Sequence, residues 1–285
     1  MAADTERDAF TGRPTTGHEW DGIKELNTPL PTWWLYTFYG TIVFAALWCV
    51  LYPSLPWLGG VLAHTERVSV VASMEVAAAG QKPFVDRILK SSLEEVRRDQ
   101  QLLAFARAGG RIAFNNNCAP CHQTDGAGAR GYPSLKDDEW LWGGSLADIE
   151  QTIRYGIRAE HDKTRNSMMP RFGADDMLKP AQIDDVVEYV LSLSKSPHDA
   201  TRAARGEKVY AETCVACHMP GGAGNRELGT PALNDAIWLY GGDRASIRAS
   251  VFAARNGVMP AWQGRIDEAT VRMLTLYVHG LGGGR

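Results

Sequence analysis

The sequence predicts an all-α protein in which one amino-terminal transmembrane helix precedes two tandem helical domains. Three observations support this fold: a charge-free apolar run from Trp33 to Tyr52, two Cys-x-x-Cys-His motifs, and a repeat of the sequence around those motifs. A chain of 285 residues is long enough for about two domains. The net charge of −3 gives no reason to expect a nucleic-acid partner.

The predicted anchor, residues 33–53, contains no charged residue. As a helix it would be about 30 Å long, which matches the apolar thickness of a bilayer. Aromatic residues mark both predicted interfaces. A cleaved signal peptide is the alternative, but its apolar segment would be only about 7–15 residues long. Cys49 lies inside the run, and we interpret it as a small apolar residue.

Residues 54–107 are predicted to form connector helices. Ser92 and Glu95 resemble a capping box that opens a helix through Phe105, and Gly109-Gly110 should break it before the first motif. The expected role of this segment is to dock the following domains on partner subunits. A plain spacer is an equally good interpretation.

The two Cys-x-x-Cys-His motifs are typical of covalent haem c attachment, with Ala-Pro between the first cysteines and Val-Ala between the second. Cysteines three apart on a helical turn can each bond one vinyl group, and the next histidine can bind the iron. Zinc modules place cysteine pairs about 15–20 residues apart, and a thioredoxin-like pair needs a βαβ setting, so neither alternative fits. We therefore predict two covalently bound haem c groups, attached to Cys118, Cys121, Cys214 and Cys217.

The sequence around the motifs is repeated, which predicts two copies of one domain, at residues 108–197 and 198–285. Each copy should contain a helix before the motif, a methionine loop and a closing apolar helix. Pro180 suits the first position of one closing helix, and Asp267 can cap the other. The matched residues are Gly110, Phe114, Pro133, Leu135, Trp140, Trp142, Gly143 and Gly144 in the first copy, and Gly206, Tyr210, Pro231, Leu233, Trp238, Tyr240, Gly241 and Gly242 in the second.

Met169 and Met259 are the expected sixth ligands of the two irons, which His122 and His218 should bind on the other side. Both methionines precede a proline, which restrains the loop. Met168 is the alternative to Met169. Such ligation raises the reduction potential, and an iron with six ligands relays electrons without binding a substrate.

The surroundings of the ligands can also be predicted. Carbonyl groups of Pro133 and Pro231 should accept hydrogen bonds from the ligand histidines. His161 is interpreted as a residue of a solvated loop. The aromatic residues expected to wall the haems are Trp140, Trp142, Trp238 and Tyr240.

The segment from His18 to Pro31, followed by Trp33-Trp34 and the apolar run, resembles the amino-terminal signature of the FixP/CcoP family, the dihaem third subunit of cbb3-type cytochrome c oxidase. The resemblance continues through the connector, both haem motifs and both Met-Pro loops. It implies two tandem class I cytochrome c domains, with His122 paired with Met169 and His218 with Met259. Some family members have a second transmembrane helix, and this sequence shows none.

By this resemblance, the protein would be an electron-transfer subunit with no dioxygen-reducing site, used in aerobic or microaerobic respiration. A cytochrome bc complex or a soluble cytochrome c would donate electrons, which would pass to the monohaem subunit and then to the catalytic haem-copper subunit. Two alternatives remain: a free-standing membrane-anchored dihaem carrier and a dihaem peroxidase.

We expect a single-pass protein of the bacterial inner membrane. Because haem c is attached outside the cytoplasm, residues 54–285 should lie in the periplasm and residues 1–32 should form a cytoplasmic tail. Arg13 and Lys24 before the span, against Arg67 after it, favour this orientation weakly.

Overall fold

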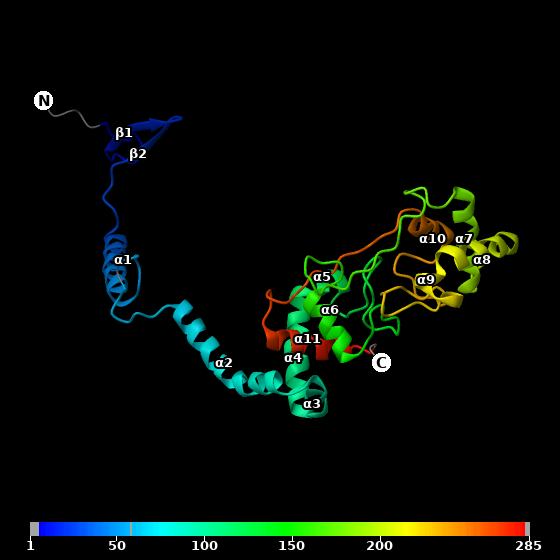
Figure 1. Cartoon of the computed structure of the whole chain (residues 1–285). Coiled ribbons are helices and arrows are strands. Elements are labelled where there is room, and N and C mark those ends of the chain that lie inside the picture. Colours follow the sequence, from blue (N-terminus) through cyan, green and yellow to red (C-terminus); the bar gives the residue numbers. More distant parts are fainter. Residues whose placement is uncertain (1–5, 58, 283–285) are drawn as a thin grey trace. The chain divides into compact units, whose positions relative to one another are not determined.

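The computed structural model describes residues 6–57 and 59–282 and is mainly helical (Figure 1). The chain divides into two compact units, Met1–Gly80 and Gln81–Arg285. Helix α2 (Glu66–Lys90) contains the boundary between them.

A small β-hairpin begins the first unit. Strands β1 (Thr15–Trp20) and β2 (Ile23–Leu26) pair antiparallel. Asp21 and Gly22 join them, both with positive φ, 50° and 81°. An Asp-Gly dipeptide favours this kind of tight turn. The hairpin was not predicted from the sequence, although the Asp-Gly dipeptide was a usable signal for it.

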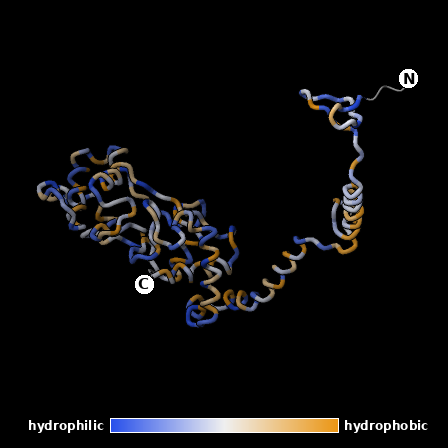
Figure 2. The backbone as a smooth tube through the Cα atoms, turned by 180° about the vertical axis from the view of Figure 1, so that it is seen from behind, coloured by the Kyte–Doolittle hydropathy of each residue, from blue (hydrophilic) through white to orange (hydrophobic). Residues whose placement is uncertain are grey.

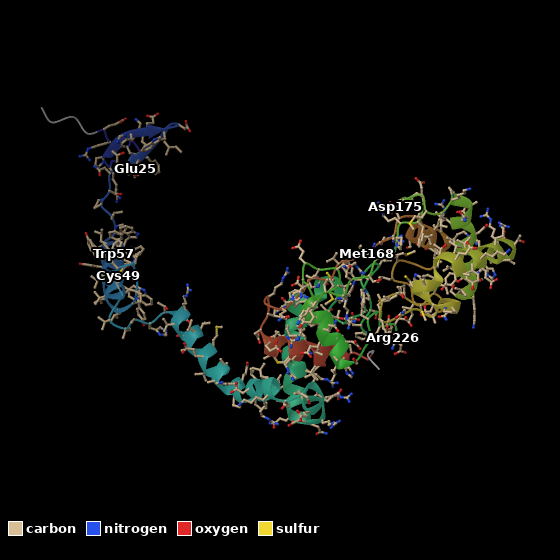
Figure 3. All side chains as sticks on the ribbon, viewed as in Figure 1. Glu25, Cys49, Trp57, Met168, Asp175 and Arg226 are labelled. Carbon is tan, nitrogen blue, oxygen red and sulfur yellow. The ribbon has the colours of Figure 1, made fainter. Side chains whose placement is uncertain are left out.

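The apolar run forms helix α1 (Thr32–Leu51), close to the predicted span. None of its residues is buried against the rest of the protein. Figure 2 shows the helix in white to orange along its length, and Cys49, labelled in Figure 3, lies near its end. Within the described residues, α1 is the one helix that is long and apolar enough to cross a membrane. It is therefore a candidate membrane anchor.

The predicted capping box is present at the start of helix α3 (Leu93–Arg98). The Ser92 hydroxyl accepts a hydrogen bond from the Glu95 backbone N–H at 3.2 Å, and the Glu95 carboxylate accepts one from the Ser92 N–H at 2.6 Å. These bonds satisfy two backbone donors that a helix start would otherwise leave unpaired.

The predicted helix break at Gly109-Gly110 is wrong. The chain breaks earlier, at Asp99, and its carboxylate caps helix α4 (Gln100–Asn117) by accepting from the Leu102 N–H at 2.9 Å. Helix α4 then continues through both glycines. The glycines are kept in the helix because another helix packs against them, and tertiary packing outweighs their low helix propensity.

Two helical bodies follow within the second unit. The first body consists of α4, α5 (Ala119–His122), α6 (Leu146–Tyr155) and α11 (Glu268–His279). Its apolar core contains Ala113, Phe114, Ile149, Ile153, Val271, Leu274 and Val278.

The second body consists of α7 (Pro180–Leu193), α8 (Ala200–Thr213), α9 (Val215–His218) and α10 (Arg244–Phe252), with a short 3₁₀ helix η1 (Pro220–Gly222). Pro180 starts α7, as predicted. Its apolar core contains Phe172, Leu178, Ile183, Val186, Val187, Val190, Leu191, Tyr210, Ile247 and Val251.

The closing helices are exchanged between the two copies of the repeat. Helix α11 belongs to the second copy but packs on α4 and α6 of the first, whereas α7 belongs to the first copy and packs on α8 and α10 of the second (Figure 1). Each copy of the repeat, predicted at residues 108–197 and 198–285, therefore packs its closing helix on the other copy. A short connection joins α7 to α8, and such connections make consecutive helices neighbours.

Candidate haem-binding sites

Each Cys-x-x-Cys-His motif forms one helical turn. In the first, the backbone N–H groups of Cys121 and His122 donate to the Cys118 carbonyl at 3.1 and 2.9 Å. In the second, the N–H groups of Cys217 and His218 donate to the Cys214 carbonyl at 3.1 and 3.0 Å. One cysteine of each pair is partly buried and the other is exposed. Both cysteines of a pair are therefore presented on one side of a turn, as covalent attachment requires.

The predicted hydrogen bonds of the two histidines expected to bind iron are confirmed. The Nδ1 atom of His122 lies 3.0 Å from the Pro133 carbonyl oxygen, and that of His218 lies 3.1 Å from the Pro231 carbonyl oxygen. A carbonyl group only accepts, so each Nδ1 carries the proton and each Nε2 is left with its lone pair. Nε2 is then the nitrogen that can bind iron.

Burial also prepares these side chains for a metal. It lowers the pKa of His122 and of His218, although the hydrogen bond to the proline carbonyl acts in the opposite direction. A neutral imidazole is the form that binds a metal ion. Burial, followed by the neighbouring thiol, raises the pKa of Cys118 and of Cys214 to about 11. Both thiols are therefore neutral at physiological pH.

The zinc alternative also finds no ligand cluster. Within residues 6–57 and 59–282, no group of three or more His, Cys, Asp or Glu side chains is placed to hold a metal ion. Each motif instead offers two cysteines for covalent attachment and one histidine for the iron, as haem c requires. The residues present therefore fit covalently bound haem.

The two predicted methionine ligands each pack on an apolar core that also contacts a cysteine of the other copy of the repeat. Met259 and Cys118 both pack against the core of the first body, whereas Met169 and Cys214 both pack against the core of the second. The exchange of closing helices carries each Met-Pro loop to the other body. Met168, labelled in Figure 3, is 65% exposed, whereas Met169 is partly buried.

His161 stays within its own loop. Its Nδ1 atom accepts a hydrogen bond from the Lys163 N–H at 3.0 Å, and its ring lies 4.8 Å from that of Tyr155. These local contacts agree with the interpretation of His161 as a loop residue.

The four predicted wall residues separate into two kinds. Trp140 packs against the core that contains Phe114, and Trp238 packs against the core that contains Tyr210. Trp142 and Tyr240 contact the opposite body instead.

Each of these two aromatic rings covers a glycine of the other copy of the repeat. A Cβ atom built on Gly229 would lie 2.0 Å from the Trp142 ring, and one on Gly131 would lie 3.3 Å from the Tyr240 ring. Both pairs occupy matched positions of the repeat. The contact is thus made twice, once in each direction. The sequence analysis matched Trp142 with Tyr240, but it did not single out the two glycines or predict that the rings cover them.

Comparison with known proteins assigns families to three parts of the chain. A model described as the N-terminal domain of cytochrome oxidase-cbb3, FixP, matches residues 12–59. A cytochrome c model matches residues 106–194, and a model of cytochrome c oxidase, cbb3-type, subunit III matches residues 201–278. The matches include the hairpin, the apolar helix and both haem motifs.

Curated relatives match over almost the full length. A cbb3-type cytochrome c oxidase subunit FixP from Bradyrhizobium sp. (strain ORS 278) is 47% identical and covers 100% of both chains. A subunit CcoP from Azospirillum brasilense is 46% identical over 99% of this chain and 100% of its own. A subunit CcoP from Cereibacter sphaeroides is 46% identical over 95% of each chain.

Proposed function

The chain belongs to the FixP/CcoP family of cbb3-type cytochrome c oxidase subunits, and from this membership we propose that it is the membrane-anchored dihaem electron-transfer subunit of such an oxidase. The observation that carries the proposal is the match at 47% identity over the whole chain, anchor and both motifs included. A free carrier would need the haem motifs and a membrane anchor, but not the amino-terminal oxidase domain matched by residues 12–59.

Two haem c groups would be attached to Cys118, Cys121, Cys214 and Cys217. When bound, haem c supplies a one-electron redox centre whose potential depends on its axial ligands. The protein contributes a neutral imidazole on one side, oriented by a proline carbonyl, and a methionine thioether on the other. These two ligands leave no open position on the iron for a substrate, which supports electron relay rather than catalysis.

The iron ligands would be paired across the repeat, His122 with Met259 and His218 with Met169. The supporting observation is that Cys118 shares one apolar core with Met259, and Cys214 shares the other with Met169. The high exposure of Met168 favours Met169 as the ligand. This proposed pairing differs from the one that the family resemblance implied, His122 with Met169 and His218 with Met259.

The partners and the orientation follow from the same proposal. Electrons would come from a cytochrome bc complex or a soluble cytochrome c, and would pass to the monohaem subunit and then to the catalytic haem-copper subunit. Haem c attachment outside the cytoplasm would place residues 54–285 in the periplasm of a bacterial inner membrane, with α1 as the anchor and residues 1–32 in the cytoplasm.

A dihaem peroxidase, the other alternative, is less well supported. It would need one iron with an open or easily displaced sixth ligand. The partly buried methionine that shares an apolar core with each motif argues against it. A ferric haem that binds cyanide or peroxide would favour the peroxidase.

The proposal is tested by purifying the chain from its native membrane in mild detergent. We expect b-type haem and copper to co-purify with it, and the intact polypeptide to carry the added mass of two haems. A Cys118→Ser, Cys121→Ser double variant should lose one haem mass, whereas Cys49→Ser should keep both. Purification without copper and b-type haem would contradict the oxidase assignment.

A further inference from the structure

The two methionine loops contact one another at the boundary between the bodies. The Met259 N–H donates to the Ile157 carbonyl at 3.0 Å, and the Ile157 N–H donates to the Met259 carbonyl at 2.9 Å. This is a two-way backbone pair of the kind found between antiparallel strands. The loop that carries Met259 is therefore held by Ile157, which belongs to the loop that carries Met169.

Met169 has a corresponding two-way pair, but a side chain provides it. The Met169 N–H donates to the Asn256 side-chain oxygen at 3.1 Å, and the Asn256 side-chain NH₂ donates to the Met169 carbonyl at 3.3 Å. A carboxamide carries one acceptor and two donors, so it can imitate the backbone of a neighbouring strand. Asn256 lies in the loop that leads to Met259.

Arg158 joins the two loops a second time. Its guanidinium Nε donates to the Gly257 carbonyl at 2.7 Å, and its Nη1 donates to the Ser167 carbonyl at 2.8 Å. These carbonyls lie two residues before Met259 and two residues before Met169. The planar guanidinium holds several donors in a fixed arrangement, so one side chain can set the spacing of both loops.

We propose that Asn256 and Arg158 are positioning residues for the iron ligands: Asn256 holds Met169 at the second haem, and Arg158 holds both methionine loops together. The inference rests on the proposed function, because it takes both methionines as ligands. A thioether is a weak, neutral ligand on a flexible side chain, so its bond to iron depends on how well the backbone is fixed. The loop of one haem thus restrains the ligand of the other.

The two ligands should not be equally robust. Met259 is held by backbone groups, which side-chain substitutions leave in place, whereas Met169 depends on the Asn256 carboxamide. Loss of Asn256 should therefore weaken the Met169 bond selectively. Loss of Arg158 should affect both bonds.

The test uses the full-length chain with both haems attached. In the ferrous protein, an iron-bound methionine gives a strongly shifted methyl resonance, and the two signals are assigned with Met169→Leu and Met259→Leu. We expect Asn256→Ala to remove or broaden the Met169 signal and to lower the potential of that haem, with the Met259 signal unchanged. Arg158→Ala should perturb both signals. Asn116→Ala and Arg202→Ala, at exposed helix positions, should change neither.

Asn256→Asp keeps the acceptor for the Met169 N–H but loses the donor, so it should give an intermediate effect even if Asn256→Ala fails to fold. Two wild-type signals in both Asn256 variants would overturn the inference. If Met169→Leu itself leaves both signals in place, the ligand assignment fails. If Met169→Leu removes one signal and the Asn256 variants remove none, only the positioning role fails.

Discussion

Gly110 of α4 lies directly against Met273 of α11, and a Cβ atom on the glycine would stand 2.3 Å from the Met273 carbonyl oxygen. The matched glycine, Gly206 of α8, lies against Asp185 of α7, where a Cβ would stand 2.0 Å from the carbonyl oxygen. Real Cβ atoms do not approach backbone oxygen so closely. Each glycine therefore marks a helix contact that joins one copy of the repeat to the other.

Substitution of either glycine should destabilise the protein. We expect Gly110→Ala and Gly206→Ala each to lower the free energy of unfolding by about 1–3 kcal/mol, because the backbones must separate to admit a methyl group. Denaturant unfolding of the detergent-solubilised protein measures the change. Gly80→Ala is the control, since its Cβ would meet nothing within 4 Å. Equal stability of all three variants would show that these contacts do not form.

The ligand pairing can be tested haem by haem. In a Cys214→Ser, Cys217→Ser background that carries only the first haem, Met259→Leu should lower the reduction potential on the order of 0.1 V, within the range of about 0.8 V that axial ligands set. Met169→Leu should have a much smaller effect in that background. Redox titration distinguishes the two variants. The reverse result would restore the pairing of His122 with Met169.

Glu188 should stabilise the second body through its charge. It is 3% exposed, and its carboxylate accepts from the Asp199 N–H at 2.8 Å and from Arg244 Nη2 at 3.0 Å. Glu188→Gln should cost about 1.5–3 kcal/mol at neutral pH, as the loss of hydrogen bonds to a charged group does. The exposed Glu207→Gln should be nearly neutral.

The cost of Glu188→Gln should also depend on pH. The hydrogen bond from Arg244 lowers the pKa of Glu188 below its usual 4.5. The contribution of the carboxylate is therefore complete above that usual value and is lost as the pH falls through the lowered one. Thermal unfolding across acid pH should show wild type and variant converging. A difference that stays constant on acidification would contradict a charge-based role.

Glu139 should show the opposite pH dependence. Burial, and then the Asp235 carboxylate, raises the pKa of Glu139 above 4.5, and Asp235 Oδ2 is buried without a hydrogen-bond partner among the described residues. The resulting stability is complete below the usual value and is lost as the pH rises through the raised one. Glu139→Gln should remove this loss and stabilise the protein at neutral pH by less than about 1 kcal/mol. Asp138→Asn, at an exposed position, should not.

Local features were predictable from the sequence because their chemistry is local. The capping box at Ser92, the Asp267 cap of α11 and the carbonyl partner of His122 all follow from short-range geometry, and the structure contains each of them. The apolar span could be predicted just as directly, because its length and its lack of charged residues are enough to identify it. The hairpin turn at Asp21-Gly22 was missed although its signal was just as local.

The exchange of closing helices could not be predicted in this way. The repeat shows that Gly110 and Gly206 are equivalent, but each copy offers a similar closing helix that could pack against either glycine. Apolar contacts are non-directional, so either closing helix could satisfy either glycine by pattern alone. The roles of Asn256 and Arg158 depend on the exchange of closing helices. They could not be predicted from the sequence because the exchange itself could not.

The placement of α11 on α4 also bears on how the protein is made. Helices α7 to α10 are contiguous in the chain, so the second body can form from neighbouring segments as they are synthesised. The first body must wait for α11, which follows all helices of the second body in the chain, before its core is covered. Distant contacts of this kind form late. We therefore expect the apparatus that attaches haem to encounter Cys118 and Cys121 while the core of the first body is still exposed. The first body, although its synthesis begins first, should complete its folding after the second.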